Sequence, residues 1–110
     1  MGFAVSTGLS IAITTTNSQE SVEKIVAAVM ERKLAACVQV FPVVSRYMWK
    51  GELQKDDEFL LQMKIRTADY AALAAAIRAV HPYETPEIIR VDIAEGDKAY
   101  LDWIDAVTAR

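Results

Sequence analysis

The sequence predicts an α+β domain, a split β-α-β sandwich in which two helices cover one face of an antiparallel sheet. Segments with the period of a strand and segments with the period of a helix follow one another in the order β-α-β-β-α-β-α. A central hairpin joins the two β-α-β halves, which is the ferredoxin-like arrangement, and an extra C-terminal helix ends the chain. The length of 110 residues fits a single domain. We place this domain at residues 9–110, after a loose N-terminal extension at residues 1–8.

The first strand and the first helix are predicted between Leu9 and Lys33. Apolar residues alternate with smaller or polar ones from Leu9 to Thr14, which is typical of a half-buried strand. The segment Asn17–Glu20 offers a helix N-cap with an acid three residues later, a capping-box pattern. Apolar residues then recur at the spacing of one helix face: Val22, Ile25, Val26, Val29 and Met30. The helix is expected to end near Lys33, where basic residues suit its negative end.

The middle of the chain is predicted to form one long β-hairpin. Residues 36–41 and 43–49 are rich in β-forming residues, and Pro42 between them is expected to bend or bulge the strand. Lys50-Gly51 is the expected turn, and residues 53–65 return as the second strand. Phe59, Leu61, Met63 and Ile65 should face one way, and Glu58, Gln62, Lys64 and Arg66 the other. The hairpin therefore has one apolar face and one mixed face.

The last part of the chain is predicted to add two helices and a short strand. Thr67 is placed to cap a helix over residues 68–80, with Tyr70, Leu73, Ile77 and Val80 on its buried stripe. Residues 88–93 form the expected strand, Glu95-Gly96-Asp97 a turn plus cap, and residues 100–108 the last helix. Because both main helices cover the same face of the sheet, we expect neighbouring subunits to cover the other face.

Charge and cysteine content exclude several classes of function. The net charge of −3 and the dispersed basic residues argue against a nucleic-acid binder, which needs a basic patch. The single cysteine excludes an intrachain disulfide and C-x-x-C metal chemistry, and it fits a reducing compartment. No apolar run approaches the roughly 20 residues that span a bilayer. Residues 1–8 lack the basic start and long apolar run of a signal peptide. We therefore expect a cytoplasmic protein without membrane or nucleic-acid partners.

The segment His81–Pro86 concentrates the chemistry of this chain. It contains the only histidine and two of the three prolines. Histidine titrates near neutrality and is the commonest metal ligand in proteins. The two prolines restrict their own backbone and that of the residues before them, so this connection should be stiff. A stiff loop that carries histidine, tyrosine and glutamate is where we expect a binding site.

Two residues are candidate metal ligands, His81 and Cys37. The alternative for His81 is a structural role at the end of the second helix, bonded to last-turn carbonyls. The alternative for Cys37 is packing as a small buried apolar side chain. The acidic cluster at residues 56–58 would suit hard cations such as Ca²⁺, but a solvated turn or strand edge is the interpretation that we favour.

Aromatic and charged residues suggest a ligand cleft and an interface. The residues expected in a ligand cleft are Trp49, Lys64, Tyr83 and Glu84. The residues expected at a subunit interface are Tyr47, Trp49 and Trp103, because tryptophan and tyrosine anchor many interfaces. No arginine or glycine-rich phosphate cradle follows the first strand, and one cysteine and one histidine make a poor catalytic set. We therefore do not expect an enzyme.

Four sequence blocks resemble the signature blocks of the CutA family. They are Leu34-Ala35-Ala36-Cys37-Val38, Tyr47-Met48-Trp49-Lys50-Gly51, His81 to Ile89 (HPYETPEII) and Tyr100-Leu101-Asp102-Trp103-Ile104. They occur in the family's order and spacing, and the resemblance covers the chain from about residue 9 to its end. It implies a ferredoxin-like subunit in a tight homotrimer, similar in layout to the PII signalling proteins. It also implies a role in tolerance of copper and other divalent cations, with no secure catalytic reaction.

The sequence departs from this resemblance at two positions. In members proposed as copper binders, a cysteine ends the first strand and a second histidine precedes the HPY triplet. Thr14 and Val80 stand at those positions here. A lone imidazole is a poor transition-metal site without further ligands.

Two hypotheses about function follow from these observations. The first is a cytoplasmic homotrimer of divalent-cation tolerance that binds copper or another divalent cation with low specificity. The second is a PII-like signalling or scaffold module that holds a small metabolite or an anion in its intersubunit clefts.

Overall fold

The computed structural model describes residues 6–110 and contains the predicted elements in the predicted order. They are β1 (Leu9–Thr16), α1 (Gln19–Met30), β2 (Cys37–Trp49), β3 (Glu52–Arg66), the 3₁₀ turn η1 (Thr67–Asp69), α2 (Tyr70–Val80), β4 (Ile88–Asp92) and α3 (Lys98–Val107). Part of the expected N-terminal extension, residues 1–5, lies outside the described residues. Thr7 and Gly8 are tied to the domain, because Thr7 Oγ1 donates to the Ile93 carbonyl and the Thr67 N–H donates to the Gly8 carbonyl.

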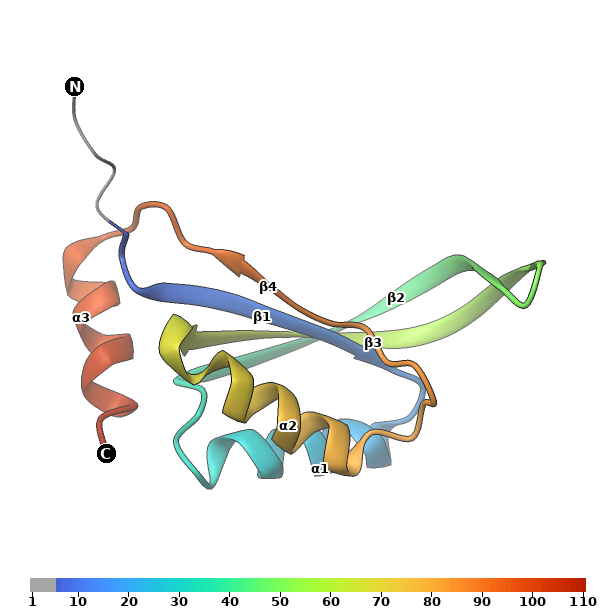
Figure 1. Ribbon diagram of the computed structural model, residues 1–110, viewed down its shortest axis with the longest axis horizontal. Helices are drawn as coiled ribbons and strands as arrows, with labels where there is room; N and C mark the ends of the chain where they lie inside the picture. The colour runs from blue at the N-terminus through green and yellow to red at the C-terminus, as the bar shows by residue number, and fades with distance from the viewer. Residues whose placement is uncertain (1–5) are drawn as a thin grey trace.

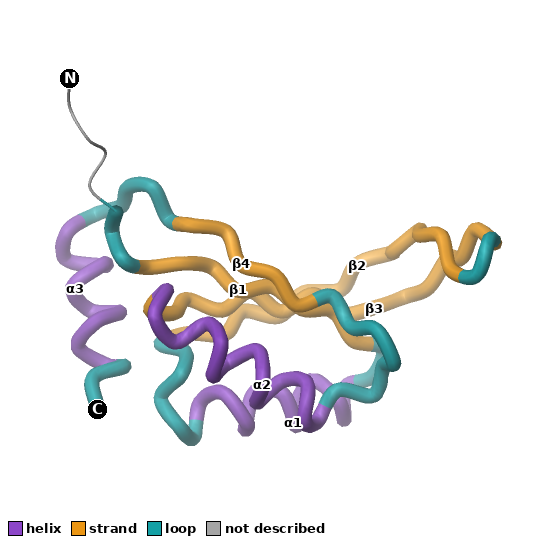
Figure 2. The backbone as a smooth tube through the Cα atoms, in the orientation of Figure 1, coloured by secondary structure: helices purple, strands orange, loops and turns teal. Residues whose placement is uncertain are grey.

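The four strands form one antiparallel sheet in the order β2-β3-β1-β4. Helices α1 and α2 pack side by side on one face of this sheet, while α3 lies across its end (Figure 1). The β2–β3 hairpin continues well beyond the helices as an arm (Figure 2). This architecture confirms the predicted split β-α-β fold with an extra C-terminal helix. No helix in residues 6–110 has both the length and the apolar character that crossing a membrane requires.

The core lies between the helices and the sheet. Leu61, Met63 and Ile65 of β3 are fully buried against Ile25 of α1 and Ile77 of α2. The apolar face predicted for the second hairpin strand is therefore confirmed. Burial of each such side chain contributes roughly 1.5–3 kcal/mol, so this layer dominates the stability of the subunit.

The face that β1 turns to the helices carries its small residues. Ser10, Ala12 and Thr14 are fully buried under the helices. Ile11 and Ile13 are only half-buried on the opposite face, where they pair with Val91 and Ile89 of β4. Small side chains on β1 let the two helices approach the sheet closely, while the larger apolar side chains lie on the face without helices. We call this second face, with the half-buried and exposed side chains of all four strands, the open face.

The pairing of the two hairpin strands continues without interruption past Pro42. Every residue of β2 from Cys37 to Trp49 has one partner on β3, and Pro42 pairs with Phe59. The bulge considered for Pro42 is therefore wrong. Because β2 is an edge strand, the missing proline N–H can face outward at no cost to the ladder. Lys50 and Gly51 both have positive φ, +49° and +79°, as a two-residue hairpin turn of type I′ requires.

The helix starts differ in detail from the predicted caps. Ser18 caps α1 by accepting the Ser21 N–H, and Glu20 pairs with Lys24 instead of completing a capping box. Thr67 does not cap α2, because its hydroxyl lies 2.6 Å from Ser10 Oγ and the 3₁₀ turn η1 precedes the helix. The prediction that Asp97 caps the last helix is confirmed, since its carboxylate accepts the Tyr100 N–H.

Two buried threonines of β1 differ in whether the side-chain hydroxyl has a hydrogen-bond partner. Thr14 and Thr16 are both fully buried, but Thr16 Oγ1 donates to Ser21 Oγ at 2.6 Å whereas Thr14 Oγ1 has no partner among residues 6–110. We expect Thr14→Val to raise the free energy of unfolding by about 1 kcal/mol and Thr16→Val to lower it by a similar amount. Urea unfolding of both variants checks this, and equal effects would contradict it.

Candidate ligand cleft

A large hollow lies where the hairpin arm leaves the domain. Its volume is about 750 Å³, and it is lined by the end of β1, by residues 45–49 of β2, by Glu58 of β3 and by residues 83–87 after α2. We call it the hairpin cleft. This volume lies in the range of small-molecule sites. The stiff loop predicted to carry a binding site forms one of its walls.

His81 fixes the start of this loop through both of its ring nitrogens. Nε2 lies 2.8 Å from the Thr15 carbonyl oxygen, so it carries the proton and donates. Nδ1 accepts the Tyr83 N–H at 3.2 Å. The ring therefore links the end of β1 to the loop as a neutral imidazole. The sequence allowed a structural His81 bonded to carbonyls of its own helix, whereas the structure places its partner on β1.

The pKa of His81 lies below its ordinary value, chiefly because burial penalises the charged ring. The hydrogen bond to Thr15 and the charge of Glu58 raise the pKa, and Arg78 lowers it, but burial outweighs them. Protonation would also replace the acceptor at Nδ1 with a donor that faces the Tyr83 N–H.

The lowered pKa of His81 predicts how the free energy of unfolding depends on pH. The unfolded state takes up a proton near pH 6.5, where the folded state does not, so the stabilisation from neutral His81 is complete above about pH 6.5 and is lost as the pH falls below it. We expect the free energy of unfolding to fall between about pH 7 and pH 5. In His81→Gln this slope should be smaller, as measured by denaturant unfolding across the range. An identical slope would show that other groups are responsible.

Glu58 and Tyr83 both line the hairpin cleft and are hydrogen-bonded to each other. Tyr83 Oη donates to Glu58 Oε2 at 2.6 Å, and only 7% of Glu58 is exposed. Burial, followed by the hydrogen bond and charge of Glu58, raises the pKa of Tyr83, so its hydroxyl stays protonated and acts as a donor. A similar pair lies further along the arm, where Tyr47 Oη donates to Asp56, and this hydrogen bond raises the pKa of Tyr47.

The lining of the cleft is aromatic and negatively charged. Its rings are Tyr47, Trp49 and Tyr83. Its carboxylates are Glu58, Glu84 and Glu87, against Arg46 as the one basic residue of the lining. This balance suits a cationic ligand better than an anionic one.

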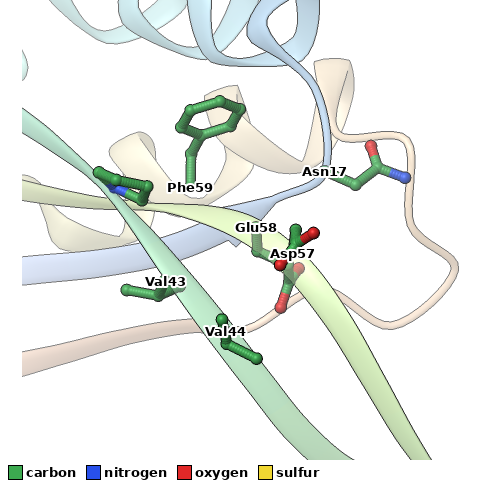
Figure 3. A pocket seen from close by; sticks show the side chains of 7 residues that line it. Asn17, Val43, Val44, Asp57, Glu58 and Phe59 are labelled. Carbon is green, nitrogen blue, oxygen red and sulfur yellow. The ribbon is translucent and has the colours of Figure 1, made fainter.

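Glu58 also borders a second, smaller hollow of about 320 Å³. Asn17, Val43 and Asp57 lie around this hollow (Figure 3). Phe59 points toward the helices and Glu58 in the opposite direction, as the strand alternation requires (Figure 3). The smaller hollow has no aromatic ring besides Phe59, so the hairpin cleft is the better candidate site.

The structure brings some of the predicted cleft residues together and separates another. Trp49, Tyr83 and Glu84 all line the hairpin cleft. Lys64 is on the same sheet face as Glu58, but it lies six positions further along β3, about 20 Å along the strand. Its ammonium donates to Gln39 Oε1 at 2.8 Å instead.

The two predicted metal ligands do not meet within one subunit. Cys37 shares a row of the sheet with Lys64 and Ile11, whereas His81 contacts Thr15, four residues further along β1. At about 3.3 Å per residue these rows are roughly 13 Å apart. Both ring nitrogens of His81 are also engaged, and Thr14 is buried. Residues 6–110 contain no group of three or more His, Cys, Asp or Glu side chains placed to hold a metal ion. The residues present therefore do not fit a preformed transition-metal site in the subunit.

The predicted interface residues are exposed in the subunit. Tyr47 and Trp49 lie on the hairpin arm, and Lys50 Nζ lies 5.7 Å from the centre of the Trp49 ring. Trp103 stacks on Tyr100 on the outer side of α3. All three aromatic side chains are available for contact with other molecules.

Glu58 lines the cleft but was not among the cleft residues predicted from the sequence. In the alternating pattern of β3 it is one of several charged residues on the mixed face. Its hydrogen-bond partner is Tyr83, which is 25 residues away in the chain. The one sequence feature that could have indicated Glu58 is the tyrosine in the stiff loop, because a buried tyrosine hydroxyl requires a hydrogen-bond partner.

The chain forms a ferredoxin-like α+β domain with an extended hairpin arm. The model of the CutA1 divalent ion tolerance protein family matches residues 10–107, and the chain belongs to this family. The divalent-cation tolerance protein CutA from Thermus thermophilus is 41% identical over 95 residues, 86% of this chain and 92% of that protein. The Protein CutA homolog of Xenopus laevis is 44% identical over 101 residues, 91% of this chain and 67% of that protein.

A solved structure agrees with this membership. The periplasmic divalent cation tolerance protein CutA from Archaeoglobus fulgidus superposes with a TM-score of 0.88 at 36% identity, covering 91% of this chain and 98% of that one. The names of the Thermus thermophilus and Archaeoglobus fulgidus relatives describe divalent-cation tolerance proteins.

Proposed function

We propose that this chain acts as a cytoplasmic homotrimer in divalent-cation tolerance and binds copper or another divalent cation weakly and with low specificity. The observation that carries this proposal is the family match over residues 10–107. Low specificity is supported by the absence, within residues 6–110, of a cluster that could hold a metal ion. His81 can become a ligand only after one of its ring nitrogens leaves its present partner.

The homotrimer is supported by the surface that the subunit leaves open. The open face of the sheet exposes Phe41, Ile89 and Val91, and the hairpin arm exposes Tyr47 and Trp49. Apolar area of this extent on strands without covering helices is typical of a subunit interface. An arm that projects from the domain is suited to reach a neighbouring subunit.

The native mass of the particle, with and without added copper, zinc or nickel, tests both parts of the proposal. We expect a trimer that takes up copper at high metal concentration and loses it readily on dilution. His81→Ala should reduce the uptake if the imidazole is a ligand, while Cys37→Ser tests the second candidate. A monomer would overturn the assembly, and a trimer that stays free of copper, zinc and nickel would overturn metal binding.

The cytoplasmic location is supported by the single cysteine, which needs no oxidising compartment. The Archaeoglobus fulgidus relative is called periplasmic, so the location has to be measured for this chain. Cell fractionation with antibodies against the untagged protein decides it. Recovery with periplasmic marker proteins would overturn the proposal.

A second candidate function is a PII-like signalling or scaffold module that binds a small metabolite. The hairpin cleft favours it, because about 750 Å³ lined by three aromatic rings has the size and character of a small-molecule site. The negative lining disfavours an anionic ligand. A thermal-shift screen of metabolites tests this function, since a ligand of the folded state raises the melting temperature. A flat screen at saturating concentrations would count against it.

A further inference from the structure

Helix α3 buries little apolar surface against the rest of the domain. Of its ten residues only Ile104 is buried, together with the capping residue Thr108, whereas α1 buries four residues. Residues 94–97, which connect α3 to the preceding part of the chain, are all exposed. A segment with few buried apolar contacts opens locally at a low free energy. The position of α3 therefore depends on the polar side chains that fasten it.

Two arginines fasten the C-terminal end of α3. Arg66 of β3 donates from Nε to Thr108 Oγ1 at 2.9 Å and from Nη2 to the Asp105 carbonyl at 2.6 Å. Arg110, just after α3, donates from Nη1 to the Lys33 carbonyl at 2.9 Å and from Nη2 to Asp69 Oδ1 at 2.5 Å. Hydrogen bonds from a charged donor are stronger than neutral ones.

The Arg110 guanidinium joins the ends of three helices. Its Nη1 contacts the carbonyl of Lys33, three residues after the end of α1, and at 3.3 Å that of Thr108, the C-cap of α3. A cation is favoured at such negative helix ends. Its Nη2 contacts Asp69, the residue immediately before α2. Arg110 thus links α3 to both helices of the core layer.

Asp69 relies on Arg110 for its counter-ion. Only 12% of its side chain is exposed, and its Oδ2 is buried with no hydrogen-bond partner among residues 6–110. Its carboxylate does not cap α2, and Arg110 is the one cation paired with it in this part of the chain. Removing one partner of such a pair leaves a buried charge without compensation, which is costly. Opening of α3 instead brings this carboxylate into water.

We propose that α3 is a hinged latch, which opens from its C-terminal end about residues 94–97 while the sheet, α1 and α2 stay folded, and which the Arg110–Asp69 pair holds closed. In the closed position the outer side of α3 presents the stacked side chains of Tyr100 and Trp103. Opening displaces this aromatic pair. The latch is independent of metal binding and of any ligand in the hairpin cleft.

Hydrogen–deuterium exchange of the assembled protein, read by mass spectrometry, tests the proposal. We expect Arg110→Ala to speed the exchange of amides in residues 101–108 by about 10-fold or more, since charge-assisted bonds are lost. Exchange in residues 22–30 and 61–65 should not change. Lys98→Ala is the control, because it removes an exposed ion pair at the other end of α3 and should change exchange by less than about 3-fold.

A change at Asp69 distinguishes the latch from a general loss of stability. Asp69→Asn keeps the size of the side chain and removes its charge, so this single variant should also speed exchange in α3. Combined with Arg110→Ala, it removes the uncompensated charge that favours the open position. The double variant should therefore exchange more slowly in α3 than Arg110→Ala alone.

Three results would overturn the proposal. Unchanged exchange of α3 in Arg110→Ala would show that other contacts hold the helix. Faster exchange in α1, α2 and β3 together with α3 would show that the helix opens only when the whole domain unfolds. A double variant that exchanges faster than either single variant would show that Asp69 and Arg110 do not act as a pair.

Discussion

Leu61→Ala is expected to lower the free energy of unfolding by about 2–5 kcal/mol, a large part of the stability of a domain of this size. Leu61 is fully buried between the sheet and the two helices, in contact with a layer that includes Met63 and Ile77. Truncation removes apolar contacts and leaves a cavity that close-packed neighbours fill only in part. Urea unfolding followed by circular dichroism measures the loss.

The matched control for this prediction is Leu53→Ala on the same strand. Leu53 is 72% exposed near the tip of the hairpin arm. The same chemical change should there alter the stability by less than about 0.5 kcal/mol. Equal losses for Leu53 and Leu61 would contradict the assignment of the core to the layer beneath the helices.

The fold was predictable because apolar residues recur along its strands and helices at clear and different spacings. The two-residue alternation from Phe59 to Ile65 identifies the face of β3 that the helices cover, and the structure buries Leu61, Met63 and Ile65. On β1 the same alternation shows that there are two faces but not which one the helices cover. Ala12 lies beneath them while Ile11 and Ile13 lie on the open face, since close helix packing requires small residues there. The size of a strand side chain beneath a helix depends on how closely that helix packs. The sequence pattern of β1 alone gives no information about this packing.

The cleft was predictable only in part. The stiff loop after the second helix and its Tyr83 could be identified from the sequence, because proline and aromatic residues have strong local meaning. Lys64 and Glu58 have the same place in the alternation of β3, yet only Glu58 lies at the cleft and is buried. What distinguishes them is which distant segment crosses the strand, and that is decided by the tertiary arrangement. Likewise, the partner of His81 is a carbonyl of β1, which the local helix-end pattern could not indicate.

Trp49→Ala provides the second large expected effect, on the assembled particle. In the subunit 38% of Trp49 is exposed on an arm that no helix covers. In the proposed homotrimer the neighbouring subunit covers the rest of the ring. Its loss should then lower the free energy of unfolding by about 3–5 kcal/mol per subunit, on the scale of buried aromatic truncations.

The neighbouring residue Met48 makes this test specific to the tryptophan. Met48 is 65% exposed and points to the opposite side of β2, because successive strand residues alternate. Met48→Ala should therefore change stability by less than about 0.5 kcal/mol. Thermal unfolding together with sedimentation measures both stability and mass. A Trp49→Ala particle that keeps its mass and melts with the wild type would place the anchor elsewhere, on the open face or at Trp103. In that case Trp49 is left free to serve as a wall of the hairpin cleft, and its effect should appear in ligand affinity instead of assembly.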